Sequence, residues 1–361
     1  MVSAALILLF ATGCTGGEEE AGNVVWSYET GGPVDGTATV AESVVYIVSD
    51  DGYLYALGAP SGSERWTASV GGGSSQPAVA DGVVYVGGGD GSLHALDASS
   101  GSSLWSYATG GPVDGGVVVS DGVVIFGSTD RNIYGLDAES GDKIWSYATS
   151  NEVHATPTVS DGRVYIGSWD GSLYALDAAT GSELWVEALG DYISGRALVD
   201  GSDVFVGVEL DNPTEDTGIL FSLSAESGVR QWEFLTQEGL HVATGVIADG
   251  STLYFGTQDW YDDGRADYLH AVSASSGAES WAFEVASSVV ATPAVGEGFV
   301  FFQDSSGFLH ALDSEGTAQW QHETGGSHSA PVIDGGIVFI GGGETNLVHA
   351  IRVPCPEDRG C

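Results

Sequence analysis

DGRVYIGSWDGSLYALDAATGSELW, residues 161–185, is the stretch that decides the fold, because recognisable copies of it recur seven more times along the chain. Asp161-Gly162 and Asp170-Gly171 are pairs that tolerate positive φ in tight hairpin turns, and Ala179-Thr180-Gly181 marks a third turn. The runs between the turns are short and rich in β-branched and aromatic residues, which is typical of strands. With a preceding strand over 156–160, the unit predicts four strands joined by three turns.

The apolar pattern of these runs indicates how the strands are buried. Val164, Tyr165 and Ile166 are consecutive apolar residues, and the run 173–176 is also apolar throughout. Strands that do not alternate between apolar and polar residues are typical of sheets covered on both faces. Each unit therefore needs a neighbour on either side.

One tryptophan closes each copy of the unit, and most successive spacings are 39 or 40 residues. This period and four strands per unit predict an all-β protein, an eight-bladed β-propeller of four-stranded antiparallel blades. A large indole at a fixed position is suited to filling the wedge between neighbouring sheets. The equivalent tryptophans are Trp26, Trp66, Trp105, Trp145, Trp185, Trp232, Trp281 and Trp320.

The two ends of the chain carry complementary parts of one blade. Residues 24–30 contain Trp26 with no inner strands before it, and residues 332–353 supply inner strands with no tryptophan strand after them. The N-terminal strand is therefore expected to complete the last blade and close the ring. The expected organisation is an apolar signal-type segment at 1–13, a lipidated cysteine and acidic tether at 14–23, one propeller at 24–353 and a tail at 354–361.

The sequence YALDAATG at 174–181, followed by Trp185, resembles the tryptophan-docking repeat of PQQ-like (quinoprotein-type) eight-bladed propellers. It recurs as YGLDAESGDKIW at 134–145 and HALDASSGSSLW at 94–105. The resemblance covers residues 24–353 and implies the fold. Within that fold, the chain is similar to the lipoprotein of the bacterial barrel-assembly machinery, an anchored propeller that docks partners through its loops. A shared fold does not by itself imply a shared activity.

The charge balance is extreme, with 50 Asp and Glu against 9 Lys and Arg, and Lys143 is the one lysine. Such a negative chain is an improbable partner for nucleic acid. An excess of one charge repels itself at low salt and keeps a protein soluble where salt screens it. The composition therefore favours a salt-loving source, a haloarchaeon, over an ordinary acidic protein.

The N-terminus predicts export and anchoring. Residues 1–13 are apolar but too few to span a bilayer, and Ala11-Thr12-Gly13-Cys14 resembles a lipobox whose cysteine is lipidated. The expected location is extracytoplasmic, on the cell membrane through this anchor; a buried strand with an incidental thiol at Cys14 is the alternative. The basic residues expected at the start of a signal are missing, which suggests a start further upstream. Cys355 and Cys361 are predicted to form a small disulfide loop, since a zinc site would need more ligands.

Comparison between the copies sorts the eight histidines. His94, His270, His310 and His349 stand where other copies have tyrosine before the Ala-Leu or Gly-Leu pair, and His322 replaces a tyrosine two residues after the blade tryptophan. These five are interpreted as packing substitutes. The remaining histidines, His154, His328 and, one residue off register, His241, lie where the chain enters an innermost strand.

Aligning the copies at that point predicts a ring around one mouth of the central channel. Most of its members are polar, so the ring either binds a cation or a partner or lines a water-filled hole. The members are Asp35, Ser74, Asp114, His154, Ser194, Val242, Val290 and His328.

Two neighbouring blades carry seven extra residues in the hairpin between their second and third strands, on the face expected to hold the ring. Their carboxylates are weak calcium candidates, because calcium takes six to eight oxygen ligands, although solvated surface loops are the favoured explanation. Trp260 and Tyr261 in the second insertion, and Trp169 on the corresponding hairpin of blade four, fall outside the repeated tryptophan position and are expected to serve as interface anchors. The calcium candidates are Glu209, Asp211, Asp216, Asp262, Asp263 and Asp267.

Two function classes fit this sequence. The resemblance implies dehydrogenases that use pyrroloquinoline quinone (PQQ) and calcium, yet the adjacent cysteine pair common beside that cofactor is absent from the chain. We therefore expect no catalytic residues and no cofactor, with the PQQ- and calcium-dependent enzyme as the alternative. The favoured interpretation is a monomeric, membrane-anchored scaffold that binds another envelope or cell-surface protein, or a small ligand, through its loop-bearing face. The expected binding face comprises Asp35, Asp114, His154, Trp169, His241, Trp260, Tyr261 and His328.

Overall fold

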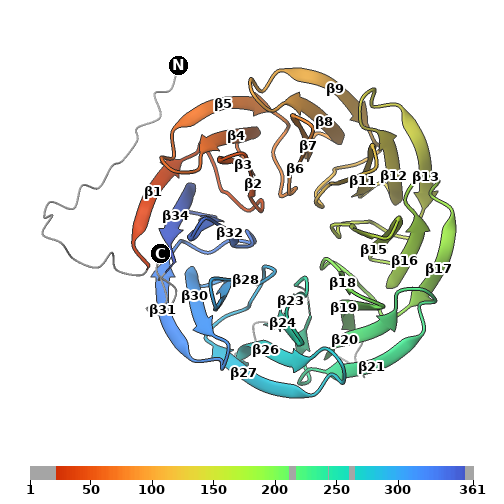
Figure 1. The fold of residues 1–361 in the computed structure, drawn as a ribbon, viewed down its shortest axis with the longest axis vertical. Helices are drawn as coiled ribbons and strands as arrows, with labels where there is room; N and C mark the ends of the chain where they lie inside the picture. Colours follow the sequence, from red (N-terminus) through yellow and green to blue (C-terminus); the bar gives the residue numbers. More distant parts are fainter. Residues whose placement is uncertain (1–21, 211–216, 243, 260–264, 354–361) are drawn as a thin grey trace, which may run out of the picture.

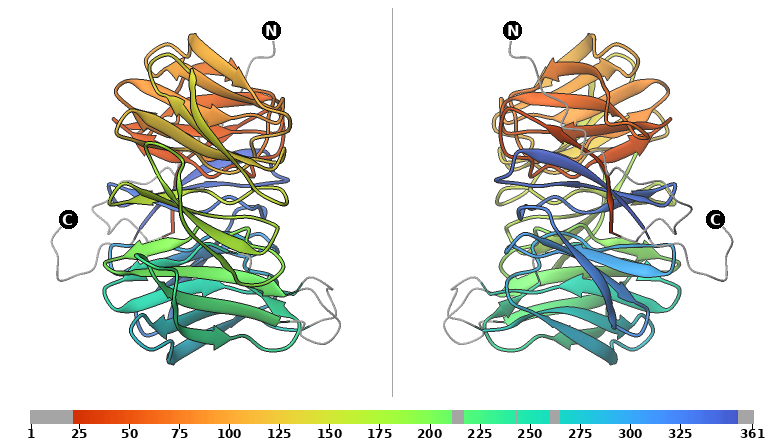
Figure 2. Two further views of the ribbon diagram at one scale, coloured as in Figure 1. Left: turned by 90° about the vertical axis from the view of Figure 1, so that its right-hand side faces the viewer. Right: turned by 90° about the vertical axis from the view of Figure 1, so that its left-hand side faces the viewer.

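The structure is a computed structural model that describes residues 22–210, 217–242, 244–259 and 265–353. It confirms the predicted fold class: eight antiparallel four-stranded sheets surround a central channel (Figure 1). Seen from the side, the ring carries hairpins on both of its faces (Figure 2). In the described part of the chain, no helix is long and apolar enough to cross a membrane.

The first four blades follow the chain from the channel outward in strand order. Each innermost strand is only three residues long, shorter than predicted. Their strands are β2 (Thr39–Ala41), β3 (Val44–Val48), β4 (Tyr53–Gly58) and β5 (Glu64–Ser69); β6 (Ala78–Ala80), β7 (Val83–Gly87), β8 (Ser92–Asp97) and β9 (Ser103–Ala108); β10 (Val118–Ser120), β11 (Val123–Ser128), β12 (Asn132–Asp137) and β13 (Lys143–Ala148); β14 (Thr158–Ser160), β15 (Arg163–Gly167), β16 (Ser172–Asp177) and β17 (Glu183–Ala188).

Blades five to eight depart from this regularity through longer strands, an added two-stranded sheet and the ring closure. Blades five to seven comprise β18 (Leu198–Asp200), β19 (Asp203–Leu210), β20 (Thr217–Ser224) and β21 (Arg230–Leu235); β23 (Ile247–Asp249), β24 (Thr252–Gly256), β26 (Asp267–Ser273) and β27 (Glu279–Val285); β28 (Ala294–Gly296), β29 (Phe299–Gln303), β30 (Phe308–Asp313) and β31 (Ala318–Glu323). Blade eight comprises β32 (Val332–Asp334), β33 (Ile337–Gly341), β34 (Leu347–Arg352) and β1 (Val24–Glu29), and the added sheet pairs β22 (Leu240–His241) with β25 (Gln258–Asp259).

The predicted turns form as their residues require. Asp161 and Gly162 take φ of 49° and 72° between β14 and β15, and Gly171 takes 78° between β15 and β16. Gly181, at 68°, also lies against Trp145 so closely that a Cβ there would be 2.5 Å from the indole. Only glycine satisfies both conditions at this position.

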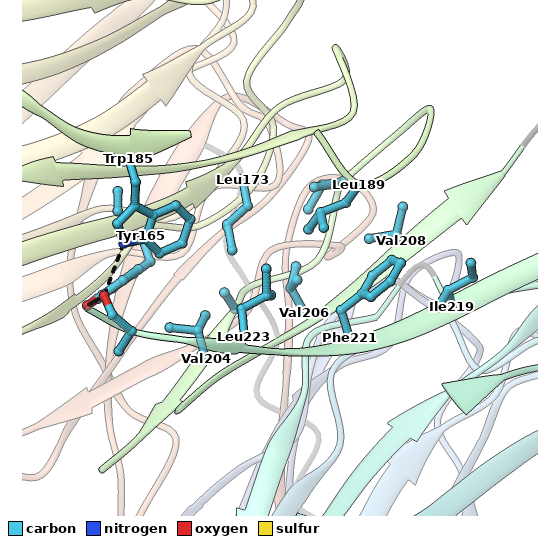
Figure 3. Packing of buried hydrophobic residues seen from close by; sticks show 14 residues of the cluster. Tyr165, Leu173, Trp185, Leu189, Val204, Val206, Val208, Ile219, Phe221 and Leu223 are labelled. Carbon is cyan, nitrogen blue, oxygen red and sulfur yellow. Dashed lines mark hydrogen bonds between the residues drawn. The ribbon is translucent and has the colours of Figure 1, made fainter. Parts of the chain in front are cut away.

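Neighbouring blades are joined by apolar clusters and by the repeated tryptophan. Between blades four and five, Tyr165, Leu173 and Trp185 pack against the second and third strands of blade five (Figure 3). The Trp185 indole N–H donates to Ala225 O at 3.1 Å, so the side chain fills the wedge and satisfies its one polar atom. Six further tryptophans make the same bond to the next blade: Trp26, Trp66, Trp105, Trp145, Trp232 and Trp281.

A β-bulge just before each tryptophan orients the outer strand. In blade four, Ala175 pairs with Trp185 and Leu176 with Glu183, so Leu184 is the extra residue. Because a bulge re-aims the side chains beside it, the indole faces the neighbouring blade while Leu184 is 45% exposed on the rim. The equivalent Leu104 and Ile144 are exposed in the same way.

The N-terminal strand closes the ring, as predicted. β1 pairs with β34 in the antiparallel register that outer strands have elsewhere. Gly22 N donates to Arg352 O at 3.0 Å, as Gly181 N does to Asp177 O at 2.8 Å. Gly22 also lies against Trp320, as Gly181 lies against Trp145. The last turn of the ring is therefore assembled from the two ends of the propeller, and we call this junction the seam.

Candidate binding face and central channel

The central channel is walled by the segments that lead into the innermost strands, which we call approach segments. They enclose a hollow of about 440 Å³ to which all eight blades contribute. Seven members of the predicted ring lie on its wall: Asp35, Ser74, Asp114, His154, Ser194, Val290 and His328.

Blade six departs from the predicted register. Val242 is fully buried in an apolar cluster with Phe205 and Leu220, so its place in the predicted ring was wrong by one residue. His241 is also fully buried, in the two-stranded sheet β22–β25, and does not lie at the channel mouth. The insertions in blades five and six explain the error, because they draw this approach segment into added strand pairing.

The approach segments and the hairpins between second and third strands lie on one face. Trp169 N donates to Glu152 O at 2.9 Å in blade four. In blade five, Tyr192 forms an antiparallel bridge with Glu209 on the extended β19. The channel mouth and the hairpins that carry the insertions are therefore adjacent parts of a single surface.

A compact group of aromatic and acidic side chains stands on this face between blades three and five. The His154 ring lies 4.0 Å from the Trp169 ring, and Tyr192 meets the same indole edge-on at 5.8 Å. His154 Nε2 donates to Glu152 Oε2 at 2.8 Å, and its Nδ1 is 3.9 Å from Asp114 Oδ2. We call this group the mouth cluster: Asp114, Glu152, His154, Trp169, Tyr192 and Ser194.

Trp169 is held in place rather than freely exposed. Its indole N–H donates to Ser194 Oγ at 2.9 Å, and the ring is partly buried between His154 and Tyr192. The sequence-based expectation of an exposed anchor is therefore corrected to a half-buried, oriented one. Such a side chain loses little conformational entropy when a partner covers it.

Carboxylates crowd the mouth beside this cluster. Burial raises the pKa of Asp114, and the nearby charges of Glu152 and Asp50 raise it further, while His154 lowers it. Burial also raises the pKa of Asp50, with the charge of Asp35 adding to the effect. Like charges held close together disfavour full ionisation, so this side of the mouth favours any group that brings positive charge.

Asp35 and His328 lie at the other side of the mouth, where blade eight meets blade one. His328 N donates to Asp35 Oδ1 at 3.3 Å. Both residues also line a second hollow of about 340 Å³, together with Ser305 and Glu344. The lining of this second hollow includes none of the mouth-cluster residues, although Asp35 and His328 share the channel hollow with that cluster.

Two calcium candidates can be placed, and both are buried. Glu209 is 1% exposed and Asp267 is 2% exposed. Burial raises the pKa of Asp267 to about 6, although Ser288 Oγ donates to it at 3.0 Å. Among the described residues, no three His, Cys, Asp or Glu side chains converge as metal ligands.

Several predicted site residues lie outside the described residues. They are Cys14, Asp211, Asp216, Trp260, Tyr261, Asp262, Asp263, Cys355 and Cys361.

The histidines interpreted as packing substitutes do take the places of tyrosines. Tyr174 OH donates to Asp170 at 2.6 Å, four residues earlier. His94 Nε2 lies 3.2 Å from Asp90, also four residues earlier, and His310 Nε2 lies 2.7 Å from Asp304. His270 bonds instead to Glu279 at 2.8 Å, and His349 to Ser27 at 3.1 Å.

Sequence comparison missed one channel residue, Arg196. It stands two positions after Ser194 on the channel wall, where blades one and four have Thr37 and Thr156. The signal was present in the repeat, because one charged residue stands where the other described copies have neutral ones. Arg196 is found only when the copies are also compared two residues after the ring position, and not at the ring position alone.

The family of the chain follows from its sequence. The family model described as outer membrane protein assembly factor BamB matches residues 16–113, 89–233 and 216–352. The chain belongs to this BamB family. No curated protein matches the sequence of this BamB-family propeller.

Solved structures of several functions share its fold. BamB from Moraxella catarrhalis is 20% identical with a TM-score of 0.76, over 91% of this chain and 99% of its own. The quinohemoprotein alcohol dehydrogenase of Comamonas testosteroni is 16% identical with a TM-score of 0.74, over 93% of this chain and 77% of its own. The computationally designed protein Ika8 has 16% identity and a TM-score of 0.73, over 90% and 98%. At these identities the likeness shows the fold alone.

Proposed function

We propose that this BamB-family propeller is a non-catalytic scaffold that docks another envelope protein through the face bearing the mouth cluster. The observation that carries the proposal is the mouth cluster itself. Its indole and imidazole rings contact each other at a tilt of 30° outside the repeated packing positions, and hydrogen bonds to Ser194 and Glu152 fix their orientation. Pre-oriented aromatic side chains on a surface are typical anchors of protein interfaces.

The charge of the face specifies the chemistry of the partner. Burial raises the pKa of Asp114, and the charges of Glu152 and Asp50 raise it further. A partner that brings arginine or lysine side chains would relieve this repulsion and be steered to the face. The family membership is consistent with a role in protein assembly, since the BamB family is described as an assembly factor.

The docking proposal is tested by capturing partners from envelope extracts in molar KCl with wild type, Trp169→Ala and Leu184→Ala. Leu184 is the matched control, because it is exposed on the rim of the same blade. Trp169→Ala is expected to reduce recovery of a specific partner at least about tenfold, as for an interface hot spot, while Leu184→Ala leaves it unchanged. Equal recovery with both variants, each with a wild-type circular dichroism spectrum, would reject this face.

Anchoring is a separate part of the proposal and rests on the sequence Ala11-Thr12-Gly13-Cys14. A lipidated Cys14 would hold the propeller at the outer surface of the cell membrane. Mass spectrometry of the membrane fraction is expected to find an acylated N-terminal cysteine, and Cys14→Ser should release the protein. An unmodified Cys14 in the mature chain would remove the anchor from the proposal without affecting the docking face.

A quinoprotein enzyme is the second candidate, supported by the fold shared with the quinohemoprotein alcohol dehydrogenase. The chain lacks an adjacent cysteine pair, and its described residues do not converge as calcium ligands. The residues described thus do not fit the cofactor. A quinone absorbance band, or alcohol oxidation after addition of PQQ and calcium, would favour the enzyme over the scaffold.

A further inference from the structure

The central channel has two chemically different layers. The first is the mouth layer, formed by the ring residues, and it includes the carboxylates Asp35 and Asp114. The second layer lies two residues further along each approach segment, and it consists of neutral side chains and Arg196. In this second layer, Arg196 is the one charged side chain among the described residues that line the channel hollow. It is exposed to the hollow, although its neighbours come from three blades.

The guanidinium of Arg196 is tethered at one end. Its Nε donates to Thr158 Oγ1 at 3.1 Å, and Thr158 Oγ1 donates to Ala197 O at 2.6 Å. An arginine has five N–H donors, so four remain beyond the tether. None of the four has an acceptor among the residues described, and no described carboxylate lies within ion-pair distance.

Arg65, Arg131 and Arg163 likewise have no described carboxylate within ion-pair distance, but Arg196 is the one arginine among the described residues that line the channel hollow. Arg230, for comparison, pairs with Glu187 at 2.9 Å on the outer rim. The surrounding channel wall lowers the pKa of Arg196 by desolvation, with no neighbouring charge to oppose the effect. A partly desolvated cation is stabilised by a counter-charge, which the protein side chains described do not supply.

Three threonines of the same layer add hydrogen-bond donors. Thr156 Oγ1 accepts from Gly116 N at 2.9 Å, Thr292 Oγ1 from Gly245 N at 3.0 Å, and Thr37 Oγ1 from Ala330 N at 3.1 Å. A hydroxyl that accepts a backbone N–H keeps its own proton for donation. The layer thus presents a guanidinium and several hydroxyl donors toward one hollow.

We propose that this layer is a binding site for a small carboxylate anion, held by Arg196 together with Thr292, whose Oγ1 flanks Gly245 as the Arg196 Cβ does. The guanidinium fork matches the two oxygens of a planar carboxylate. The acidic mouth selects for low charge, because Coulomb repulsion from Asp35 and Asp114 is twice as large for a dianion as for a monoanion. The site shares only the charge of Asp114 with the mouth cluster and none of its aromatic side chains, so loss of docking in Trp169→Ala would leave it intact.

The test uses the full chain and acetate as the probe. Arginine Nε–H signals are followed by NMR while potassium chloride is replaced by potassium acetate at constant potassium concentration. The chain has eight arginines, so the Arg196 signal can be assigned by its loss in Arg196→Gln. The expected result is a saturable shift of this signal with an apparent Kd on the order of 10 mM, and a weaker response when phosphate replaces acetate.

Variants at Arg196 distinguish the two-pronged hydrogen bonding of the guanidinium from its positive charge. Acetate binding, followed by the line width of its methyl signal, should weaken about tenfold or more in Arg196→Gln and by a smaller factor in Arg196→Lys, which keeps the charge without the fork. Arg65→Gln, on the outer strand β5, is the matched control and should bind as wild type does. Trp169→Ala should also bind acetate normally, even where it loses the protein partner.

Three results would overturn the proposal: no saturable shift on replacing chloride, equal binding of acetate and phosphate, or unchanged binding in Arg196→Gln. Unfolding midpoints in the same salt check that the variants are folded. Arg196→Lys keeps the site testable if Arg196→Gln does not fold.

Discussion

The interface between blades three and four and the interface between blades seven and eight are built from equivalent positions but differ in their polar contacts. In the first, Trp145 donates to Ala178 O at 3.1 Å, and Tyr147 packs edge-on against Tyr174. In the second, Trp320 has no acceptor for its buried indole N–H among the described residues, and a histidine pair replaces the two tyrosines.

The reason for the difference is the seam. Each tryptophan docks on the turn between the third and fourth strands of the next blade, and in blade eight that turn is divided between Val353 and Gly22. A Cβ at Gly181 would lie 2.5 Å from Trp145, whereas one at Gly22 would lie 3.5 Å from Trp320. Noncovalent closure keeps the shape of the interface but leaves it looser and less fully hydrogen-bonded.

The largest expected effect comes from removing β1 altogether. Deleting residues 24–30 leaves blade eight with three strands and exposes the apolar cluster that Trp26 and Tyr28 share with blade one. We expect loss of cooperative folding, not local fraying. Urea unfolding in molar KCl, followed by fluorescence, measures it, and a synthetic peptide of residues 22–30 added in trans should restore part of the transition. An unchanged midpoint would mean that the seam does not support the ring.

The second effect is the contribution of the seam to the pH dependence of stability. Burial, together with the nearby charge of His322, lowers the pKa of His349 to about 4. In the unfolded chain His349 takes up a proton near pH 6.5, whereas in the folded protein it does so only near pH 4. The free energy of unfolding therefore falls as the pH drops from 6.5 to 4 and changes little through this group below pH 4. The loss attributable to His349 is about 3 kcal/mol.

The measurement compares urea unfolding between pH 7 and pH 4 in wild type and His349→Phe. The variant should lose less stability on acidification than wild type. Tyr174→Phe is the control at the regular interface, where it removes no group that titrates in this range and should keep the wild-type slope. Identical slopes in wild type and His349→Phe would contradict the assignment.

The third effect concerns the two turn glycines. Gly181→Ala introduces both a left-handed alanine and a clash with Trp145, whereas Gly22→Ala introduces the left-handed conformation with space beside Trp320. Gly181→Ala is therefore expected to destabilise the fold by about 2 kcal/mol more than Gly22→Ala. Matching urea midpoints for the two variants would show that the seam is as tightly packed as a continuous turn.

The smallest effect isolates the indole hydrogen bond. Trp145→Phe removes a donor and leaves Ala178 O without its partner, while Trp320→Phe removes an N–H that has no acceptor among the described residues. The first should destabilise the fold by about 1 kcal/mol more than the second. If Trp320→Phe proves the more damaging, its indole N–H has a partner beyond the described residues.

Much of the fold was predictable because eight copies of one sequence repeat each form the same four-stranded blade. The strand order, the turn at Asp161-Gly162 and closure by β1 follow from local rules applied to aligned copies. The structural places of His94 and His310 were predictable for the same reason, since each copy with tyrosine serves as a control.

The candidate site was less predictable where the copies diverge in length. The insertions of blades five and six shift the register, which moved Val242 and His241 from the predicted mouth into the interior. Trp169 shows a second limit, because its ring contact with His154 and its bond to Ser194 depend on a tryptophan that belongs to no repeated pattern. Arg196 was missed because alignment of the repeats identifies residues that the copies have in common. The proposed binding site depends instead on a residue that differs from its counterparts in the other copies.

The seam also shows how the chain connectivity of this ring could be changed. Asp177-Ala178 and Gly181-Ser182 are separated by two residues in a continuous turn, and Arg352-Val353 and Gly22-Asn23 hold the same positions with the same backbone hydrogen bonds. A two-residue linker between Val353 and Gly22 would therefore produce a covalently closed circle. Opening that circle at Ala179-Thr180 gives a circular permutant whose seam lies between blades three and four, with the weakness now at a different and chosen interface.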